Sequence, residues 1–412
     1  MTSGTTNLNR KQRSVGIELL RIISMLSVMV LHVLGQGGIL EKTNISQSQY
    51  GVAWFLEVLC FFGVTTYALI SGFVGIDGNY RLSSIVYVWL QVVFYTVIIT
   101  CIFAVTVPGS VGGYDVVAML TPVTSGQYWY FSAYFGMFFL IPLVNLGINA
   151  LKKSYLNAIF VLVVLFFSIL SCISYSDVFS LKEGYSVLWL LACYFIGAYM
   201  KRFKIFEKIK SWKLICIIVL CVVLTWAFKI VLDIFTQSPR SGLLIAYNSP
   251  TVLLMSMALV VLFARMKFAD KCATEKSASE CVMESSTPEC GAKESGDATE
   301  LQANTQKPTL RSRIRKVILK IAPLSFGVYL INTNPYIFRY LMKDRFAHLA
   351  NYPSLLLAIS VILNALVIFL VCIAIDAVRK LIFDLCGLRE KLYIIEKKIC
   401  EHIDGNVERT KI

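Results

Sequence analysis

Residues 15–34, VGIELLRIISMLSVMVLHVL, form an apolar run that also contains Glu18, Arg21 and His32. About twenty helical residues, each rising about 1.5 Å, cross the roughly 30 Å hydrocarbon core of a bilayer, so this run predicts a transmembrane helix. A charged side chain near the middle of a membrane costs roughly 2.5 to 3.5 kcal/mol on insertion scales. Three polar side chains in one span therefore indicate a helix with a function.

These three side chains are expected on one face of the helix. Glu18 and Arg21 are three residues apart and can form an ion pair. Arg21 and His32 are separated by about three turns, roughly 16 Å along the axis, which returns to within roughly 20° of the same face. Such a row could connect the two sides of the membrane. The alternative is that the charged pair lies among the near headgroups and His32 among the far ones.

His32 is the one membrane candidate for a side chain that titrates near neutrality. The chain has 3 histidines, and His348 and His402 fall outside the apparent spans. Glu57 is expected at about the depth of His32 in the second span and could orient the imidazole ring. It could equally be an interfacial carboxylate beside Trp54.

The composition indicates a polytopic membrane protein. Of the 412 residues, 57% are hydrophobic and 16% are charged, against about 25% charged residues in soluble domains. The net charge of +14 would suggest nucleic-acid binding in a soluble protein, but here the basic residues cluster in short loops, so no nucleic-acid partner is expected. The 12 cysteines form no CxxC pair with interleaved histidines, so neither a metal site nor a disulfide framework is expected.

Hydropathy predicts an all-α fold with about ten transmembrane helices. They lie near 15–34, 52–76, 82–107, 128–150, 155–175, 186–200, 213–235, 249–265, 317–336 and 354–379. Most lysines and arginines then fall on the side of the N-terminus, so both termini are expected in the cytoplasm.

Three kinds of segment are predicted along the chain. Residues 1–14 are a basic cytoplasmic N-terminus, residues 15–379 form the transmembrane domain, and residues 380–412 form a cytoplasmic amphipathic tail that is helical from about Leu388. Residues 267–310 contain too few large apolar side chains to fold alone and are expected to be a disordered cytoplasmic loop of unassigned role.

Four short motifs occur in order along the predicted spans. They are a basic lead with Leu-Arg and a later His, a Phe-Phe run leading to Ser-Gly-Phe, an aromatic opening ending in Pro, and a Ser, Gly, Tyr-Leu-Ile pattern. Their residues are Arg13, Leu20, Arg21 and His32; Phe61, Phe62, Ser71, Gly72 and Phe73; Tyr128, Trp129, Tyr130 and Pro142; and Ser325, Gly327, Tyr329, Leu330 and Ile331. Together these motifs resemble the integral-membrane acyltransferases of type 3, which typically O-acetylate cell-surface sugars.

The chain departs from this family in three respects. Relatives often continue the last motif into His, where this chain has Asn332, so a second imidazole is absent. Relatives also often have several arginines after the second span, where Arg81 stands alone. Nothing after Arg379 has the motifs of the esterase-like domain that some relatives carry, so a stand-alone membrane module is expected.

The resemblance implies transfer of an acetyl or other short acyl group from cytoplasmic acyl-CoA to a hydroxyl of an extracytoplasmic or lipid-linked carbohydrate. It also implies a multi-pass protein of a bacterial plasma membrane. The donor phosphates need cationic partners at the inner face, where Arg21 and Arg81 are expected. His32, with Arg21 and Glu18 on the same helix, would be catalytic, and its imidazole could either remove the hydroxyl proton or carry the acyl group.

The acceptor would bind near the outer ends of the spans. Tyr128, Trp129 and Tyr130 could stack on a sugar, although an outer aromatic belt is the commoner reason for such residues. Asn332 and Asn334 could hydrogen-bond the acceptor. No bound cofactor is expected, because acyl-CoA is a substrate, and membrane lipid is the other expected partner.

Two other functions fit the composition. A transporter or flippase of a surface glycan would usually show inverted repeats and paired broken helices, and no clear internal repeat is found. A membrane scaffold or sensor would leave the row of Glu18, Arg21 and His32 unexplained. The acceptor sugar, the acyl chain and the oligomeric state are left open.

Overall fold

The structure of the chain is a computed structural model that describes residues 13–174, 176–236, 239–266 and 310–409. Over these residues it is all-helical, without a strand, as the sequence predicts. The predicted loop at 267–310 lies outside the described residues except for Leu310, which begins a helix.

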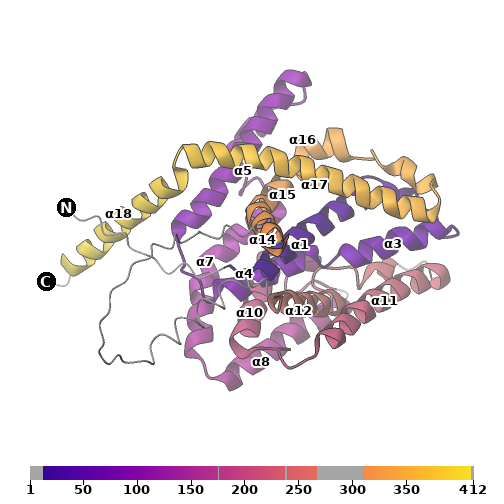
Figure 1. Ribbon diagram of the computed structural model, residues 1–412, viewed down its shortest axis with the longest axis horizontal. Coiled ribbons are helices and arrows are strands. Elements are labelled where there is room, and N and C mark those ends of the chain that lie inside the picture. Colours follow the sequence, from indigo (N-terminus) through magenta and orange to yellow (C-terminus); the bar gives the residue numbers. More distant parts are fainter. Residues whose placement is uncertain (1–12, 175, 237–238, 267–309, 410–412) are drawn as a thin grey trace, which may run out of the picture.

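The helices follow one another in the order in which they are labelled in Figure 1. They are α1 (Val15–Leu34), α2 (Ile39–Lys42), α3 (Ser48–Cys60), α4 (Gly63–Gly75), α5 (Leu82–Thr106), α6 (Gly113–Leu120), α7 (Trp129–Ala150), α8 (Lys153–Val163), α9 (Ser171–Ile173), α10 (Val187–Phe203), α11 (Ser211–Thr236), α12 (Pro250–Ala264), α14 (Leu310–Ile321), α15 (Ser325–Asn332), α16 (Pro335–Ile337), α17 (Ser354–Leu385) and α18 (Leu388–Arg409). A π-helical segment, Val164–Leu170, joins α8 to α9.

Seven helical segments of the described chain are long and apolar enough to cross a membrane. They are Val15–Lys42, Ser48–Gly75, Leu82–Thr106, Trp129–Ala150, Lys153–Ile173, Ser211–Thr236 and Ser354–Leu385. The chain is therefore a multi-pass membrane protein, whereas the total of ten spans and the side on which the termini lie stay predictions.

The three other predicted spans are short or interrupted. α10 and α12 have 17 and 15 residues. The predicted span at 317–336 is divided between α14, a 3₁₀ turn, α15 and α16. Pro323 lies in the 3₁₀ turn and Pro335 begins α16, and because proline lacks a backbone N–H, a continuous helix is not favoured here.

α1 is surrounded by other helices. It packs against α3, α4, α12, α14, α15 and α17, and Figure 1 shows it in the middle of the bundle. Leu20, Val33 and Leu34 on this helix are completely buried. The polar row of α1 therefore faces protein rather than lipid, as expected for functional polar side chains in a membrane.

The backbones of α4 and α10 touch. A Cβ at Gly72 would lie 1.9 Å from the carbonyl oxygen of Tyr194, and one at Gly197 would lie 2.1 Å from that of Leu69. Small residues at such a crossing let membrane helices approach closely, which is the commoner role of a Ser-Gly pair like Ser71 and Gly72. The short α10 is thus held firmly inside the bundle.

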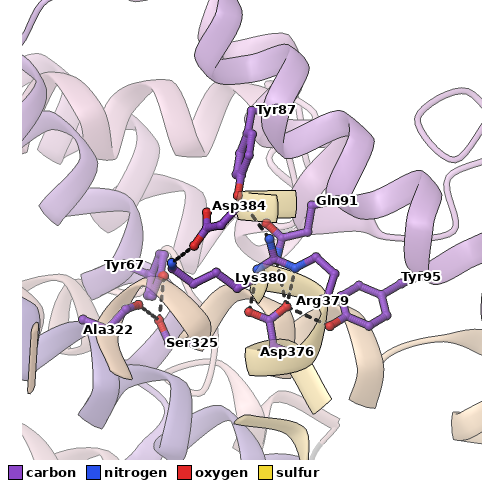
Figure 2. A network of polar contacts seen from close by, with 10 residues as sticks. All are labelled: Tyr67, Tyr87, Gln91, Tyr95, Ala322, Ser325, Asp376, Arg379, Lys380 and Asp384. Atoms are coloured by element: carbon purple, nitrogen blue, oxygen red, sulfur yellow. Dashed lines mark hydrogen bonds and ion pairs between the residues drawn. The ribbon is translucent and has the colours of Figure 1, made fainter. Parts of the chain in front are cut away.

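A buried ion pair joins α5, α15 and α17 (Figure 2). Arg379 donates to Asp376 through Nε at 2.9 Å and through Nη2 at 2.7 Å. Tyr95 of α5 donates to the same carboxylate at 2.7 Å. A Cβ at Gly327 of α15 would lie 2.1 Å from Cγ of Asp376, so only glycine leaves room for this carboxylate.

Candidate active site

The row of polar side chains on α1 is present in the structure. Arg21 Nη1 donates to Glu18 Oε1 at 2.8 Å, as the spacing of three residues predicts. At the far end of the helix, Nδ1 of His32 donates to Oδ1 of Asn332 on α15. The two ends of the row lie in the walls of two different cavities.

The arginine cavity lies at the start of α1. It has a volume of about 630 Å³, and the charged side chains in its wall are Arg13, Glu18, Arg21, Arg81 and Arg389. Among the described residues, four cations thus face one carboxylate, and that carboxylate is already paired with Arg21. The positive potential of the arginine cavity favours an anionic ligand. Its guanidinium groups suit a phosphate in particular, because they can bind phosphate oxygens in a bidentate manner.

The histidine chamber is a much smaller space beside His32. Its volume is about 40 Å³, and aromatic rings dominate its wall, including Tyr67, Trp129, Tyr130 and Tyr329. The arginine cavity and the histidine chamber share Tyr67, Tyr130 and Phe326. The two spaces are therefore neighbours on opposite sides of a few side chains.

Asn332 fixes the orientation of the His32 ring. Because the Asn332 oxygen can only accept, the hydrogen bond places the proton of a neutral imidazole on Nδ1 and leaves a lone pair on Nε2. A nitrogen with a free lone pair is what a general base or a nucleophile needs. Asn332, at the position where relatives often have His, thus orients the ring of His32.

The sequence suggests only a stacking role for Tyr130, but the structure also makes its hydroxyl a candidate functional group. Its side chain is buried, its hydroxyl has no hydrogen-bond partner among the described residues, and its ring lies in the walls of both cavities. An unpartnered buried hydroxyl is costly unless a ligand completes it. The aromatic motif that begins α7 contains the signal, but this motif also fits an interfacial aromatic belt.

A third space, the Glu57 cavity, lies on the other side of the histidine chamber. Its volume is about 790 Å³, and its wall includes Trp54, Glu57 and Phe61. The ring of Phe61 stacks on that of Tyr247 with centroids 4.7 Å apart, and Tyr247 lies in the wall of the histidine chamber. Oε2 of Glu57 and Nε1 of Trp54 are buried without a hydrogen-bond partner among the described residues.

The structure groups the predicted site residues in a new way. Arg21 and Arg81 lie in the wall of one cavity, as expected for a shared role, and Trp129 lies in the wall of the histidine chamber. Glu57 lies in the wall of a different cavity from His32, and the partner of the His32 ring is Asn332.

Two predicted acceptor residues contact each other instead of a cavity. Asn334 Nδ2 donates to the hydroxyl of Tyr128 at 3.0 Å, and Oδ1 of Asn334 accepts from the backbone N–H of Tyr336 at 3.0 Å. Neither Tyr128 nor Asn334 lies in the wall of the three cavities. These contacts give both side chains a structural role in holding α16 against the start of α7.

No group of three His, Cys, Asp or Glu side chains among the described residues is arranged to hold a metal ion. No curated protein and no solved structure matches the chain. A family model described as an acyltransferase domain matches residues 14–271, which include α1 with Arg21 and His32, Arg81 before α5, and Tyr130 in α7. Since this match covers more than half of the chain and agrees with the arrangement around α1, the chain belongs to the acyltransferase 3 family of membrane acyltransferases.

Proposed function

We propose that the chain transfers an acetyl or other short acyl group from cytoplasmic acyl-CoA to a hydroxyl of an extracytoplasmic or lipid-linked carbohydrate, in the plasma membrane of a bacterium. The observation that carries the proposal is the common wall between the arginine cavity and the histidine chamber. It brings a site suited to an anionic donor next to a neutral imidazole.

The arginine cavity suits the donor. CoA carries several phosphate groups, and the excess of arginine over carboxylate in the wall favours their binding. The volume of about 630 Å³ lies within the usual range of roughly 300–1,000 Å³ for small-molecule sites. The cavity lies at the start of α1, and in the orientation that the positive-inside rule predicts this end of the helix faces the cytoplasm.

The histidine chamber suits a short acyl group. A water molecule needs about 10–15 Å³ of such volume, so a chamber of about 40 Å³ has room for a few non-hydrogen atoms. An acetyl group is of this size, whereas a sugar ring is not. The size of the chamber therefore favours acyl transfer over passage of a glycan, which the transporter alternative requires.

His32 and Tyr130 supply the chemistry. In one route, Nε2 of His32 removes the proton of the acceptor hydroxyl, the alkoxide oxygen bonds to the thioester carbon, and the C–S bond breaks to release the CoA thiolate, which takes up the proton. In the other, Nε2 itself bonds to the thioester carbon and the C–S bond breaks to release the CoA thiolate. The acceptor oxygen then bonds to the acyl carbon, the C–N bond breaks to restore the neutral imidazole, and the hydroxyl proton passes to the thiolate. In both routes the Tyr130 hydroxyl donates to the developing oxyanion.

The Glu57 cavity is the proposed acceptor site. The unpartnered Glu57 oxygen can accept from a sugar hydroxyl, and the unpartnered Trp54 N–H can donate to one. Trp129 contributes its ring to the wall of the histidine chamber, between the proposed donor and acceptor sites.

Purified protein in lipid nanodiscs, given labelled acetyl-CoA and a carbohydrate acceptor, is expected to form an O-acetylated product and free CoA. Absence of both CoA binding and transfer would refute the proposal.

Tyr130→Phe is expected to lower kcat by about 10²-fold, the low end of the effect of losing one oxyanion donor, with little change in KM for acyl-CoA. The phenyl ring keeps the packing of the wall and removes only the hydroxyl. Initial rates over a range of acetyl-CoA concentrations measure both constants. Tyr128→Phe is the matched control, because it removes a neighbouring hydroxyl that bonds Asn334 outside the cavities. Equal effects of the two substitutions would refute the role of Tyr130.

Arg21→Lys is expected to raise KM for acyl-CoA and to lower kcat/KM by about tenfold. Lysine keeps the positive charge but lacks the planar fork that can bind Glu18 and a phosphate together. The measurement is the steady-state rate together with the dissociation constant of CoA. Unchanged affinity and unchanged turnover would exclude Arg21 from the donor site.

A further inference from the structure

α18 forms part of the wall of the arginine cavity. Arg389 and Tyr393 of this helix face the same space as Arg21 and Arg81, although the sequence predicts residues 380–412 as a tail separate from the transmembrane domain. Figure 1 shows α18 continuing beyond α17 after a bend. At this bend Gly387 has φ +59°, a left-handed conformation that glycine adopts without strain.

Four contacts hold α18 against the start of α5. Oε1 of Glu396 accepts from the backbone N–H of Leu82 at 2.6 Å, and Oε2 accepts from the Ser83 hydroxyl. The Arg81 guanidinium lies 5.1 Å from the ring centroid of Tyr393. The Arg389 guanidinium lies 5.1 Å from that of Tyr87. Arg389 contacts the later residue Tyr87 and Glu396 the earlier residue Leu82, so the helices meet as an antiparallel pair.

Glu396 is well suited to hold this junction. The first N–H groups of α5 have no partner inside the helix, and the positive end of the helix dipole attracts a carboxylate. Burial works against the charged form, but the hydrogen bonds from Ser83 and Leu82 outweigh it and hold the pKa of Glu396 below its usual value. The carboxylate therefore stays charged at neutral pH.

A row of exposed apolar side chains runs beside the face of α18 that contacts α5. Ile395, Ile399 and Ile403 recur at helical spacing and are all more than half exposed. With lysines beside them, this pattern is typical of a helix that lies on a membrane surface. This apolar row of α18 thus fits the headgroup region, while the adjacent side chains Arg389, Tyr393 and Glu396 face the cavity and α5.

We propose that α18 completes the donor site: Glu396 docks the helix on the start of α5, and docking places Arg389 where it binds a phosphate group of acyl-CoA. This inference rests on the proposed function. It assigns a binding residue and a positioning residue to a part of the chain beyond residues 14–271, to which the family model is matched. Arg389 binds the ligand, whereas Glu396 acts through the position of the helix.

The test uses the full-length protein in phosphatidylcholine nanodiscs with CoA as the probe. Arg389→Gln and Glu396→Ala are each expected to raise the Kd of CoA about tenfold, which corresponds to about 1.4 kcal/mol, close to the usual contribution of one charged hydrogen bond. Glu396→Ala is also expected to speed hydrogen–deuterium exchange in peptides that cover residues 81–87 and 388–403. Arg389→Gln keeps the hydrogen bonds of Glu396 and should speed that exchange much less.

The same helix offers matched controls. Glu401→Ala removes an exposed carboxylate that pairs with Lys397 on the surface, and Lys391→Gln removes an exposed cation near Arg389. Both control variants should bind CoA as the wild type does. A Kd that stays unchanged in Arg389→Gln, or exchange that stays unchanged in Glu396→Ala, would overturn the proposal.

Lipid composition and the wild-type affinity give two further tests. If Arg389→Gln weakens CoA binding only when the nanodiscs contain phosphatidylglycerol, Arg389 binds lipid headgroups and the proposal is wrong. If the wild type binds no CoA, the proposed function fails. Exchange in Glu396→Ala still reports whether α18 docks, so the two failures are distinguishable.

Discussion

His32→Ala is expected to lower acyl transfer by at least about 10³-fold while expression and membrane insertion stay intact. A positioned general base contributes roughly 10²–10⁴-fold, and no other histidine lies in the three cavities to replace it. Removing one imidazole near the end of a span barely changes its hydrophobicity. The measurement is product formation from labelled acetyl-CoA, normalised to the amount of correctly inserted protein.

A second histidine provides the control. His348 is exposed and its ring packs near that of Tyr352, so His348→Ala should retain normal activity. His32→Ala should also bind CoA with nearly unchanged affinity, because its ring lies outside the arginine cavity. Substantial acetylation by His32→Ala would remove this residue from the mechanism.

Asp376→Ala is expected to cause the largest loss of stability, about 3–5 kcal/mol, because it leaves the Arg379 guanidinium buried without its partner. It also removes the acceptor of the Tyr95 hydroxyl and the contact with Gly327, so α5, α15 and α17 lose their common junction. Most of the protein should be lost from the folded fraction. Size-exclusion chromatography after heating in detergent measures that fraction.

The same helix offers a matched control for this variant. Asp384 pairs with Lys380 on the surface of α17, four residues apart, as Figure 2 shows. Exposed pairs of this kind add little stability, so Asp384→Ala should behave like the wild type. The double variant Asp376→Ala with Arg379→Leu should recover part of the loss, since it removes the unpaired charge. Wild-type stability of Asp376→Ala would show that the buried pair does not hold the helices together.

Much of the fold could be predicted from local patterns. The hydropathy of residues 15–34 gave α1 with its bounds, and the spacing of Glu18 and Arg21 gave their ion pair. Hydropathy is less informative for helices that are too short to cross a membrane alone and are buried by contacts with other helices. α10 is short, but its close approach to α4 buries it, and the prolines around α15 divide a stretch that reads as one apolar run.

The candidate site was predictable only in part, for a similar reason. Arg21 and His32 are recognisable because charge and imidazole are rare inside spans, whereas Arg81 was suggested by the resemblance to the family. Arg389 lies far along the chain from Arg81, and no periodic pattern connects them. Asn332 was expected to bind the acceptor, but its side-chain oxygen accepts a hydrogen bond from Nδ1 of His32. Such pairings depend on how distant helices pack, which a single sequence does not encode locally.

The stacked rings of Phe61 and Tyr247 bear on how well the membrane stays sealed. The proposed reaction, with its donor in one compartment and its acceptor in the other, requires a path through the protein that could let protons and salts leak. Here the space between the two wide cavities holds only a few atoms and is walled by aromatic rings, which offer an ion nothing to replace its hydration shell. Vesicles that contain the protein should therefore keep an imposed pH gradient as long as protein-free vesicles do.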